Sequence, residues 1–346
     1  MHLDRAMSWG PPPDWLAVDV IDSHTGGEPF RLVVGGLPEI PGDTVLEMRR
    51  FARENLDWLR RALMLEPRGH ADMYGGWLGA PVSPDSDLSV LFLHNEGFST
   101  MCGHGIIALS KIVLDTGILP INYDATILRI DTPAGQIVSN STTVAGRVGE
   151  VRFTNVPSFV DSLDNVVFVE SLGHVRYDLA FGGAYYAYVS APGLGMVWPP
   201  ARQSELIDAG RVIKKAIEDD RPIIHPEQAE LGFLYGVIFA GPPLDPSNDY
   251  RNVCVFADGE VDRSPTGTGV SGRIAIDAAR GDFRADEVMR IESVVGSVFE
   301  GSYKETTMIG GYQAVVPVIG GTASITGRST YWIDPEDRLG AGFLIR

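Results

Sequence analysis

The segment MCGHGIIALSKIVLDTG at residues 101–117 has a counterpart in SPTGTGVSGRIAIDAARG at residues 264–281. Each segment begins at a glycine-rich corner and continues with the spacing of a helix that closes on a glycine. Placed in register without a gap, Cys102 lies over Thr266, and the offset of 164 residues holds through to both closing glycines. We interpret the two segments as the same part of a repeated α/β unit.

Two helix starts that face each other would form an anion site. The first N–H groups of a helix have no partner within it, and its start carries about half a positive charge. A carboxylate between two such ends would be held by backbone amides. The carbon attached to that carboxylate would then lie between Cys102 and Thr266. In an amino acid, that carbon is Cα.

The remaining segments predict an α+β protein. Forty glycines and 23 prolines indicate many turns and short strands. The stretch IDSHTGGEPFRLVVGGL at residues 21–37 is typical of two strands joined by a glycine-containing turn. A single helix is expected over residues 44–65, where Thr44 and Glu47 have capping-box spacing. A second helix is expected from about residue 204 to 217.

The internal repeat indicates two similar domains. We predict an N-terminal domain over residues 1–157, which carries Cys102, and a C-terminal domain over residues 158–325, which carries Thr266. Residues 326–346 are expected to return to the first domain as a tail. The two helix starts would then face each other across a cleft between the domains.

The charge balance limits the partners. A formal net charge of −17, from 28 basic and 45 acidic residues, works against binding to phosphate backbones and anionic lipids. We therefore expect a small-molecule substrate, no nucleic acid and no membrane. The N-terminal leader has no apolar signal-peptide core, and no stretch reaches the roughly 18 apolar residues of a spanning helix. This predicts a cytoplasmic protein, and a homodimer is left open.

Cys102 is the candidate base for removing an α-proton. A helix start favours the thiolate over the thiol, which otherwise predominates at neutral pH. Cys254, in the apolar run VCVFA, is expected to be buried and inert, and the two cysteines fit neither a disulfide framework nor a zinc pattern. His104 can be a core histidine, a metal ligand or a substrate contact, of which the last is favoured. Asp262 is either a loop residue or a partner for a substrate ammonium.

No cofactor or metal is expected. Gly267, Gly269 and Gly272 spell GxGxxG, but they follow a proline-containing loop and do not come directly off a strand, so the dinucleotide context is missing. Pyridoxal phosphate needs a Schiff-base lysine. None of the four lysines of the chain has a suggestive setting.

MCGHG, together with DRSPTGTG at residues 262–269, resembles the proline racemase superfamily, whose fold is like that of diaminopimelate epimerase. The similarity runs from DSHTGGEPFR at residues 22–31 to IDPEDRLGAGF at residues 333–343. It implies two similar α/β domains, each with a sheet curled around a central helix, and an active site in the cleft between them. It also implies Cys102 as the base and Asp262 near the substrate ring nitrogen. The residues it places around the substrate carboxylate and ring are Gly103, His104, Gly267 and Thr268.

Thr266 departs from the racemases of this family, which carry cysteine there because inversion needs one acid/base on each face. A threonine hydroxyl is far less acidic than a thiol. Members with this cysteine and threonine pair resemble enzymes that dehydrate trans-3-hydroxy-L-proline to Δ1-pyrroline-2-carboxylate. In that substrate the α-hydrogen and the C3 hydroxyl share a ring face. We hypothesise that Cys102 takes the α-proton, that the thiol or His104 assists the loss of water, and that Thr266 positions the substrate.

Three alternatives stay open. The nearest is a proline racemase or 4-hydroxyproline 2-epimerase that uses a group other than Thr266 on the second face. The second is a non-catalytic binding protein for cyclic amino acids, which would bind ligand equally well after Cys102→Ser. The third is a dinucleotide oxidoreductase, which requires NAD(P)H binding.

Overall fold

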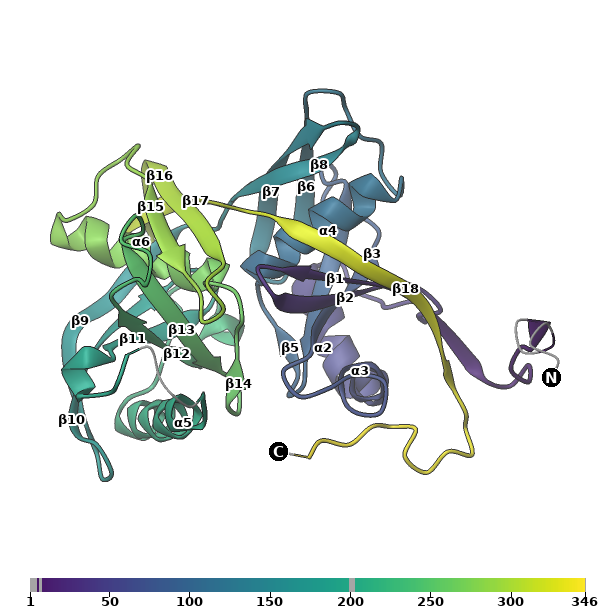
Figure 1. Ribbon diagram of the computed structural model, residues 1–346, viewed down its shortest axis with the longest axis horizontal. Coiled ribbons are helices and arrows are strands. Elements are labelled where there is room, and N and C mark those ends of the chain that lie inside the picture. Colours follow the sequence, from purple (N-terminus) through teal and green to yellow (C-terminus); the bar gives the residue numbers. More distant parts are fainter. Residues whose placement is uncertain (1–4, 6–7, 199–202, 346) are drawn as a thin grey trace.

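The computed structural model describes residues 5, 8–198 and 203–345. Parts of the N-terminal leader and the last residue of the expected tail, Arg346, lie outside the described residues. The elements gather into two groups that lie side by side (Figure 1). The mixed α+β composition that the sequence predicts is confirmed.

The first group holds eight strands and three helices within the described residues. They are β1 (Leu16–Thr25), β2 (Glu28–Gly35), α2 (Val45–Asn55), α3 (Asp57–Met64), β3 (Tyr74–Gly79), β4 (Leu88–His94), β5 (Phe98–Ser99), α4 (Gly103–Asp115), β6 (Ala125–Thr132), β7 (Gly135–Val144) and β8 (Arg147–Thr154).

The second group follows along the chain. It comprises β9 (Ser158–Val169), β10 (Gly173–Phe181), β11 (Tyr185–Ser190), α5 (Gln203–Asp220), β12 (Leu234–Gly241), β13 (Tyr250–Phe256), β14 (Glu260–Val261), α6 (Gly267–Arg280), β15 (Met289–Glu292), β16 (Val298–Ile309) and β17 (Tyr312–Gly321), with 3₁₀ turns at Pro192–Leu194 and Ala229–Leu231. The last strand, β18 (Ala323–Ile333), returns to the first group and pairs with β1.

The strand pairing of the first group recurs in the second. In the first, β1–β2 is antiparallel, β2–β3 parallel, β3–β4 antiparallel and β4–β6 parallel. In the second, β10–β11, β11–β12, β12–β13 and β13–β15 repeat that order of directions. β18 flanks β1 as β9 flanks β10. The repeat inferred from residues 101–117 and 264–281 therefore extends to the topology of the strands around them.

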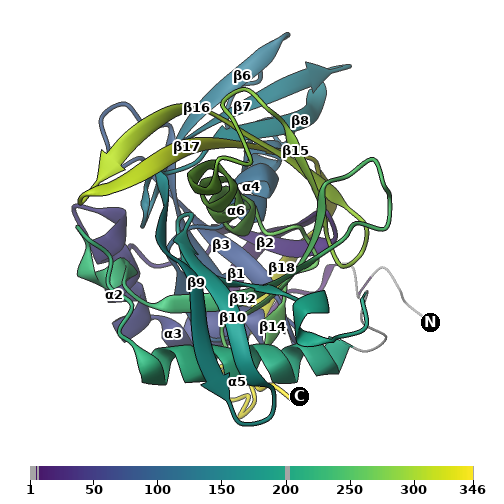
Figure 2. The same ribbon diagram turned by 90° about the vertical axis from the view of Figure 1, so that its left-hand side faces the viewer.

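Helices α4 and α6 occupy the same place in the two groups. α4 packs on β1, β7, β8 and β18, and α6 packs on β9, β10, β16 and β17. Figure 2 shows both helices in the middle of the molecule with strands around them. Of the 13 residues of α4, all but Lys111 and Asp115 are buried. A helix that is apolar on all sides belongs in a core, and this one is held there by strands on several sides.

The prediction of a single helix over residues 44–65 is wrong, because the structure has two helices there, α2 and α3. Thr44 caps α2 and accepts a hydrogen bond from the Glu47 N–H at 3.2 Å. The chain leaves helical geometry at Leu56, with φ −123° and ψ 12°. The break reorients α3 so that Arg60 donates to the carbonyl of His94 at the end of β4, at 2.8 Å. Tertiary contacts therefore override a continuous helical period.

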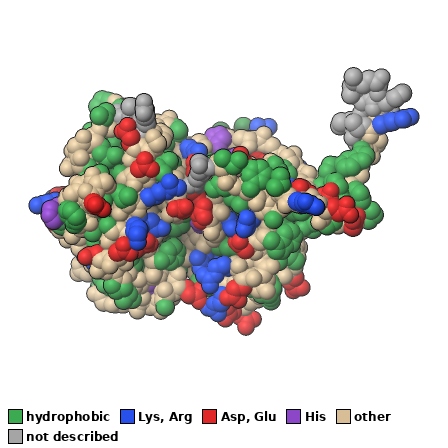
Figure 3. Space-filling model, turned by 90° about the horizontal axis from the view of Figure 1, so that it is seen from below, with side chains coloured by type: hydrophobic (Ala, Val, Ile, Leu, Met, Phe, Trp, Pro, Cys, Tyr) green, Lys and Arg blue, Asp and Glu red, His purple; other side chains and the backbone are tan. Residues whose placement is uncertain are grey.

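The second predicted helix is confirmed as α5, which runs three residues further than expected, to Asp220. Among the described residues, no helix is long and apolar enough to cross a membrane. On the face shown in Figure 3, basic side chains are interspersed with acidic ones and form no broad basic surface.

Candidate active site

Cys102 is the N-cap of α4. Its backbone is extended, with φ −146° and ψ 107°, and its sulfur accepts a hydrogen bond from the Gly105 N–H at 3.2 Å. The Ile106 N–H makes the first intrahelical bond of α4, to the Cys102 carbonyl at 3.0 Å. The N–H groups of Gly103 and His104 precede that bond and point out of the helix start, where the helix dipole favours a negative charge.

Thr266 holds the matching position at the start of α6. Its backbone has φ 66° and ψ 92°, a conformation that is strained for a β-branched residue. The Ser264 hydroxyl accepts the Thr266 N–H at 3.1 Å and helps to hold this shape. The Thr266 hydroxyl oxygen is buried, without a hydrogen-bond partner of standard geometry among the described residues. A buried hydroxyl at a strained position is typical of a binding site, and this one lies beside Asp262, whose pKa its hydrogen bond lowers.

The two helix starts meet at Gly103 and Gly267. A Cβ on Gly103 would lie 2.7 Å from the Cα of Gly267, so the two backbones are in direct contact. Around this contact lies one cavity. Its lining comes from both groups of elements: Tyr74, Met101, Cys102, Gly103, His104, Tyr186, Tyr235, Phe256, Asp262, Thr266, Gly267 and Thr268.

The structure brings all seven sequence-predicted site residues to this cavity. The side chains are shielded from solvent: Cys102 is 4% exposed, Asp262 4% and Thr266 5%. Inside such a closed space, water does not screen charges, so each polar group acts strongly on its neighbours. Within the described residues, no three His, Cys, Asp or Glu side chains are grouped to hold a metal ion.

His104 lies against the thiol. Its Nδ1 is 3.3 Å from the Cys102 sulfur, and its ring packs edge-on against Tyr74 with centroids 4.8 Å apart. Burial lowers the pKa of His104 to about 3, which a hydrogen bond to the Pro29 backbone partly opposes. The imidazole is therefore neutral at physiological pH, and it can orient the thiol without adding a positive charge.

The Cys102 thiol is kept protonated in the closed cavity. Burial raises its pKa well above the ordinary value, and the hydrogen bond from the Gly105 N–H opposes that rise. The charge on Asp262 raises the pKa further, while a hydrogen bond from Tyr74 lowers it. A cation placed between the thiol and Asp262 would reverse part of this effect, because it favours the thiolate.

Two buried carboxyl groups adjoin the site. The Asp262 carboxylate accepts the Ser264 N–H at 2.7 Å, and burial raises its pKa to about 6 against the opposing effect of the Ser264 hydrogen bonds. Glu28 is fully buried and accepts the Arg263 N–H at 2.7 Å. Burial, and next the charge on Asp262, raise the pKa of Glu28 well above its usual value. Of the two groups, Asp262 is therefore the one that is ionised near neutral pH and can pair with a substrate ammonium.

Sequence reasoning missed the aromatic wall of the cavity, which is made of Tyr74, Tyr186, Tyr235 and Phe256. The Tyr186 hydroxyl contacts the Thr268 hydroxyl at 2.8 Å. Both cysteines are free thiols, as the sequence predicts. Cys254 is fully buried in β13 and is absent from the described cavity lining.

A thiol at one helix start, facing a second helix start, is suited to acid/base chemistry beside a bound anion. The chain belongs to the proline racemase family: the sequence model described as proline racemase matches residues 20–344. The resemblance carried by the two motifs is thereby confirmed.

Three similar proteins illustrate the range of the family. The chain is 45% identical to a Colwellia psychrerythraea protein named trans-3-hydroxy-L-proline dehydratase, over 96% of this chain and 94% of that one. It is also 45% identical to a Burkholderia multivorans protein named 3-hydroxyproline 2-epimerase, over 95% of this chain and 98% of that one. A solved hydroxyproline epimerase from Agrobacterium vitis, with bound trans-4-OH-L-proline, has 30% identity and a TM-score of 0.90, and covers 95% of this chain and 96% of that chain.

Proposed function

We propose that this protein dehydrates trans-3-hydroxy-L-proline to Δ1-pyrroline-2-carboxylate and water, with Cys102 as the base at Cα. The observation that carries the proposal is the pairing of Cys102 with Thr266 across one cavity. A thiol can take the α-proton, whereas the hydroxyl opposite is too weak an acid to invert the centre. The Colwellia protein, named for this dehydration, supports the substrate.

We infer that the two groups of elements are two domains of diaminopimelate epimerase-like fold, residues 1–157 and 158–325, with the site in the cleft between them. The repeated strand pairing supports this division. Residues 326–346 belong with the first domain, because β18 pairs along β1.

The substrate carboxylate would bind between the two helix starts. The N–H groups of Gly103 and His104 on one side, and of Gly267 and Thr268 on the other, precede the first intrahelical bonds of their helices. Four amides and two helix dipoles would stabilise the negative charge that develops on the carboxylate as Cα loses its proton. The ring ammonium would pair with Asp262, and its positive charge would favour the Cys102 thiolate.

Elimination then needs only one face of the ring. In trans-3-hydroxy-L-proline the α-hydrogen and the C3 hydroxyl lie on the same face, which would be the face toward Cys102. The thiolate takes the α-hydrogen, the Cα–C3 double bond forms, and the C3–O bond breaks. The hydroxyl leaves with a proton as water, and the proton gained by the thiol balances the one that the site gives up. The enamine tautomerises to the cyclic imine, while Thr266 holds the other face of the ring.

Epimerisation is the second candidate, because the Burkholderia multivorans protein named as an epimerase is just as similar to this chain. Inversion at Cα requires a proton donor on the Thr266 side. The ionisable group there is Asp262, whose pKa burial raises to about 6. An Asp262 that returned a proton to Cα would incorporate solvent deuterium into an inverted amino acid.

The test is to incubate the protein with trans-3-hydroxy-L-proline in D₂O. Imine is followed by its reaction with an aromatic amine reagent, and the residual amino acid by NMR and chiral chromatography. The proposal expects imine and no inverted isomer. Inverted, α-deuterated hydroxyproline without imine would show an epimerase and overturn the dehydratase. A Cys102→Ser variant that binds substrate and yields imine at the wild-type rate would overturn the role of the thiol.

A further inference from the structure

The Tyr74 hydroxyl is a buried polar group of the cavity that hydrogen-bonds to the Cys102 thiol but has no part in the elimination described above. Tyr74 lies on β3, in the same group of elements as Cys102, and is 2% exposed. Its ring packs edge-on against His104, the neighbour of the thiol. Its hydroxyl contacts the Ser99 hydroxyl closely and the Tyr235 hydroxyl at 3.3 Å. The phenol is thus held in place on the Cys102 side of the cavity.

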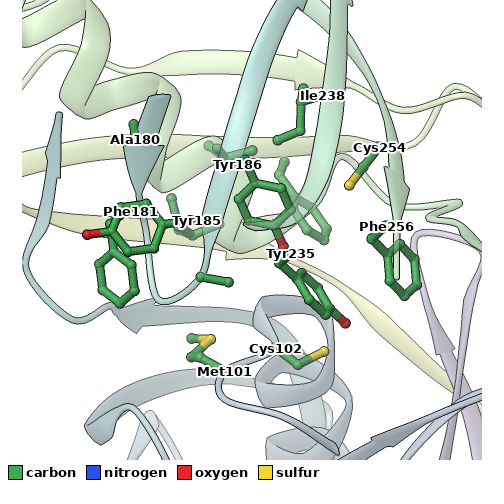
Figure 4. Packing of buried hydrophobic residues seen from close by; sticks show 14 of the residues in the cluster. Met101, Cys102, Ala180, Phe181, Tyr185, Tyr186, Tyr235, Ile238, Cys254 and Phe256 are labelled. Carbon is green, nitrogen blue, oxygen red and sulfur yellow. The ribbon is translucent and has the colours of Figure 1, made fainter. Parts of the chain in front are cut away.

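The two neighbours of Tyr74 can both donate to it. A hydroxyl has one proton to give and two lone pairs to accept with. When Ser99 and Tyr235 donate into the Tyr74 oxygen, the Tyr74 proton points to the Cys102 side of the cavity, where it hydrogen-bonds to the thiol. Figure 4 shows the hydroxyl end of Tyr235 reaching from β12 to the neighbourhood of Cys102. The three hydroxyls therefore form a short network that aims one proton at the space beside the thiol.

His104, Thr266 and Asp262 are less suited than Tyr74 to give a proton to the C3 hydroxyl. Burial lowers the pKa of His104 to about 3, so the imidazole is neutral, and it is already bonded to the Pro29 backbone. Thr266 and Asp262 come from the second group of elements, and Asp262 is assigned to the substrate ammonium. Burial raises the pKa of Tyr74 well above 10, so the phenol stays protonated and available to donate.

We propose that Tyr74 is a catalytic residue that binds the C3 hydroxyl of the substrate and gives it a proton as it leaves. This inference rests on the proposed dehydration. Cys102, as the thiolate, takes the Cα hydrogen, and the electron pair of that bond forms the Cα–C3 double bond as the C3–O bond breaks. The Tyr74 proton joins the departing oxygen, which leaves as water. The phenolate then takes the proton that the thiol gained, which restores both side chains.

Tyr74 would also select the substrate. A site that hydrogen-bonds a substrate hydroxyl discriminates strongly against analogues that lack it, because its own polar group is left unpaired. A hydroxyl on C4 would leave the Tyr74 proton without its partner at C3. The cavity is thereby matched to 3-hydroxylated rings over 4-hydroxylated or unsubstituted ones.

The experiment is Tyr74→Phe, which removes the hydroxyl and keeps the ring against His104. Imine formation from trans-3-hydroxy-L-proline should fall about a hundredfold, as is usual when a general acid is lost. With α-deuterated substrate, the primary isotope effect on that rate should be no larger than in the wild type, because C–O cleavage becomes the slow step. A larger isotope effect would place Tyr74 at proton abstraction and overturn the inference.

Tyr185→Phe is the matched control. Tyr185 is a fully buried tyrosine that lies outside the described cavity lining, and its hydroxyl donates to the Ile224 carbonyl at 3.1 Å. It should leave the imine rate within threefold of wild type. Ser99→Ala is a second, milder probe, which removes one donor to Tyr74 and should give a smaller loss with the same isotope pattern.

The outcomes separate this inference from the proposed function. If the wild-type protein makes no imine, the proposed function fails and the role of Tyr74 in it fails as well. If the wild type makes imine and Tyr74→Phe does so within threefold of its rate, only the role of Tyr74 is overturned. If Tyr74→Phe is poorly folded by circular dichroism, a Ser99→Ala rate equal to wild type overturns the network.

Discussion

Gly103 and Gly267 are in contact at the candidate active-site cavity, and neither leaves room for a side chain on the other. A Cβ on Gly103 would lie 2.7 Å from the Cα of Gly267, and a Cβ on Gly267 would lie 2.8 Å from the Cα of Gly103. Both are the first residues of their helices, so the contact sets the distance between the two helix starts. The width of the proposed anion site therefore depends on two glycines.

Gly103→Ala should disable the enzyme without unfolding it. The new methyl group would meet backbone at Gly267, which cannot swing aside as a side chain would, so the helix starts must separate. A displacement of about 1 Å at a reacting centre can cost about a hundredfold in rate. We expect kcat/KM for imine formation to fall by at least that factor. Gly97→Ala is the control, because nothing lies within 4 Å of its Cβ position. Equal activity of both variants would show that the contact does not control the site.

Cys102→Ser should abolish turnover while preserving the fold and ligand binding. Serine is a good N-cap, so it can accept the Gly105 N–H in place of the sulfur and keep the start of α4 intact. A serine hydroxyl is a far weaker acid than a thiol, and loss of a general base costs about 10²- to 10⁴-fold in rate. Imine assays and calorimetric titration with trans-3-hydroxy-L-proline measure the two effects. Cys254→Ala, at the thiol outside the described lining, should keep the wild-type rate.

The site was predictable from the sequence because its parts are local. A glycine corner followed by a helix can be read from a dozen residues, and the gap-free register of Cys102 with Thr266 predicted that the corners pair. The structure brings them to one cavity together with Asp262, which precedes Thr266 by only four residues. Each of these positions is set by its own corner, so little tertiary information was needed to find them.

The aromatic wall and the break at Leu56 were not predictable in this way. Tyr74 and Tyr186 lie within the span over which the chain resembles the family, but adjacent residues of a buried strand look alike, and only the fold decides which one faces a cavity. Likewise, residues 44–65 have an unbroken helical period. The break depends on the docking of Arg60 onto the end of β4, which is a long-range contact.

Activity should rise with pH through two ionisations. Burial raises the pKa of Asp262 to about 6, so below that pH its carboxyl is protonated and cannot pair with the substrate ammonium. kcat/KM should therefore fall as the pH drops through about 6. Burial also raises the pKa of the Cys102 thiol, so the thiolate, and with it kcat/KM, should increase toward alkaline pH.

The measurement is the pH profile of kcat/KM for wild type and Asp262→Asn. The variant should have a higher KM and should lack the ionisation near pH 6. The alkaline rise in kcat/KM, which follows formation of the Cys102 thiolate, should also begin at a lower pH in the variant. The charge on Asp262 raises the pKa of Cys102, and the variant lacks that charge. A profile that keeps the step near pH 6 in Asp262→Asn would assign that step to another group.

Thr266→Cys should turn part of the dehydration into inversion. The change puts a second thiol on the opposite face of Cα, where it can return a proton to the carbanion before the C3–O bond breaks. Cysteine lacks the β-branch that strains Thr266 at φ 66°, so the backbone should accept it. We expect the imine rate to fall, and inverted, α-deuterated 3-hydroxyproline to form from trans-3-hydroxy-L-proline in D₂O. Thr266→Ser, which keeps a hydroxyl, should give no inversion. An unchanged imine rate in Thr266→Cys without any inverted product would mean that this side chain does not face Cα.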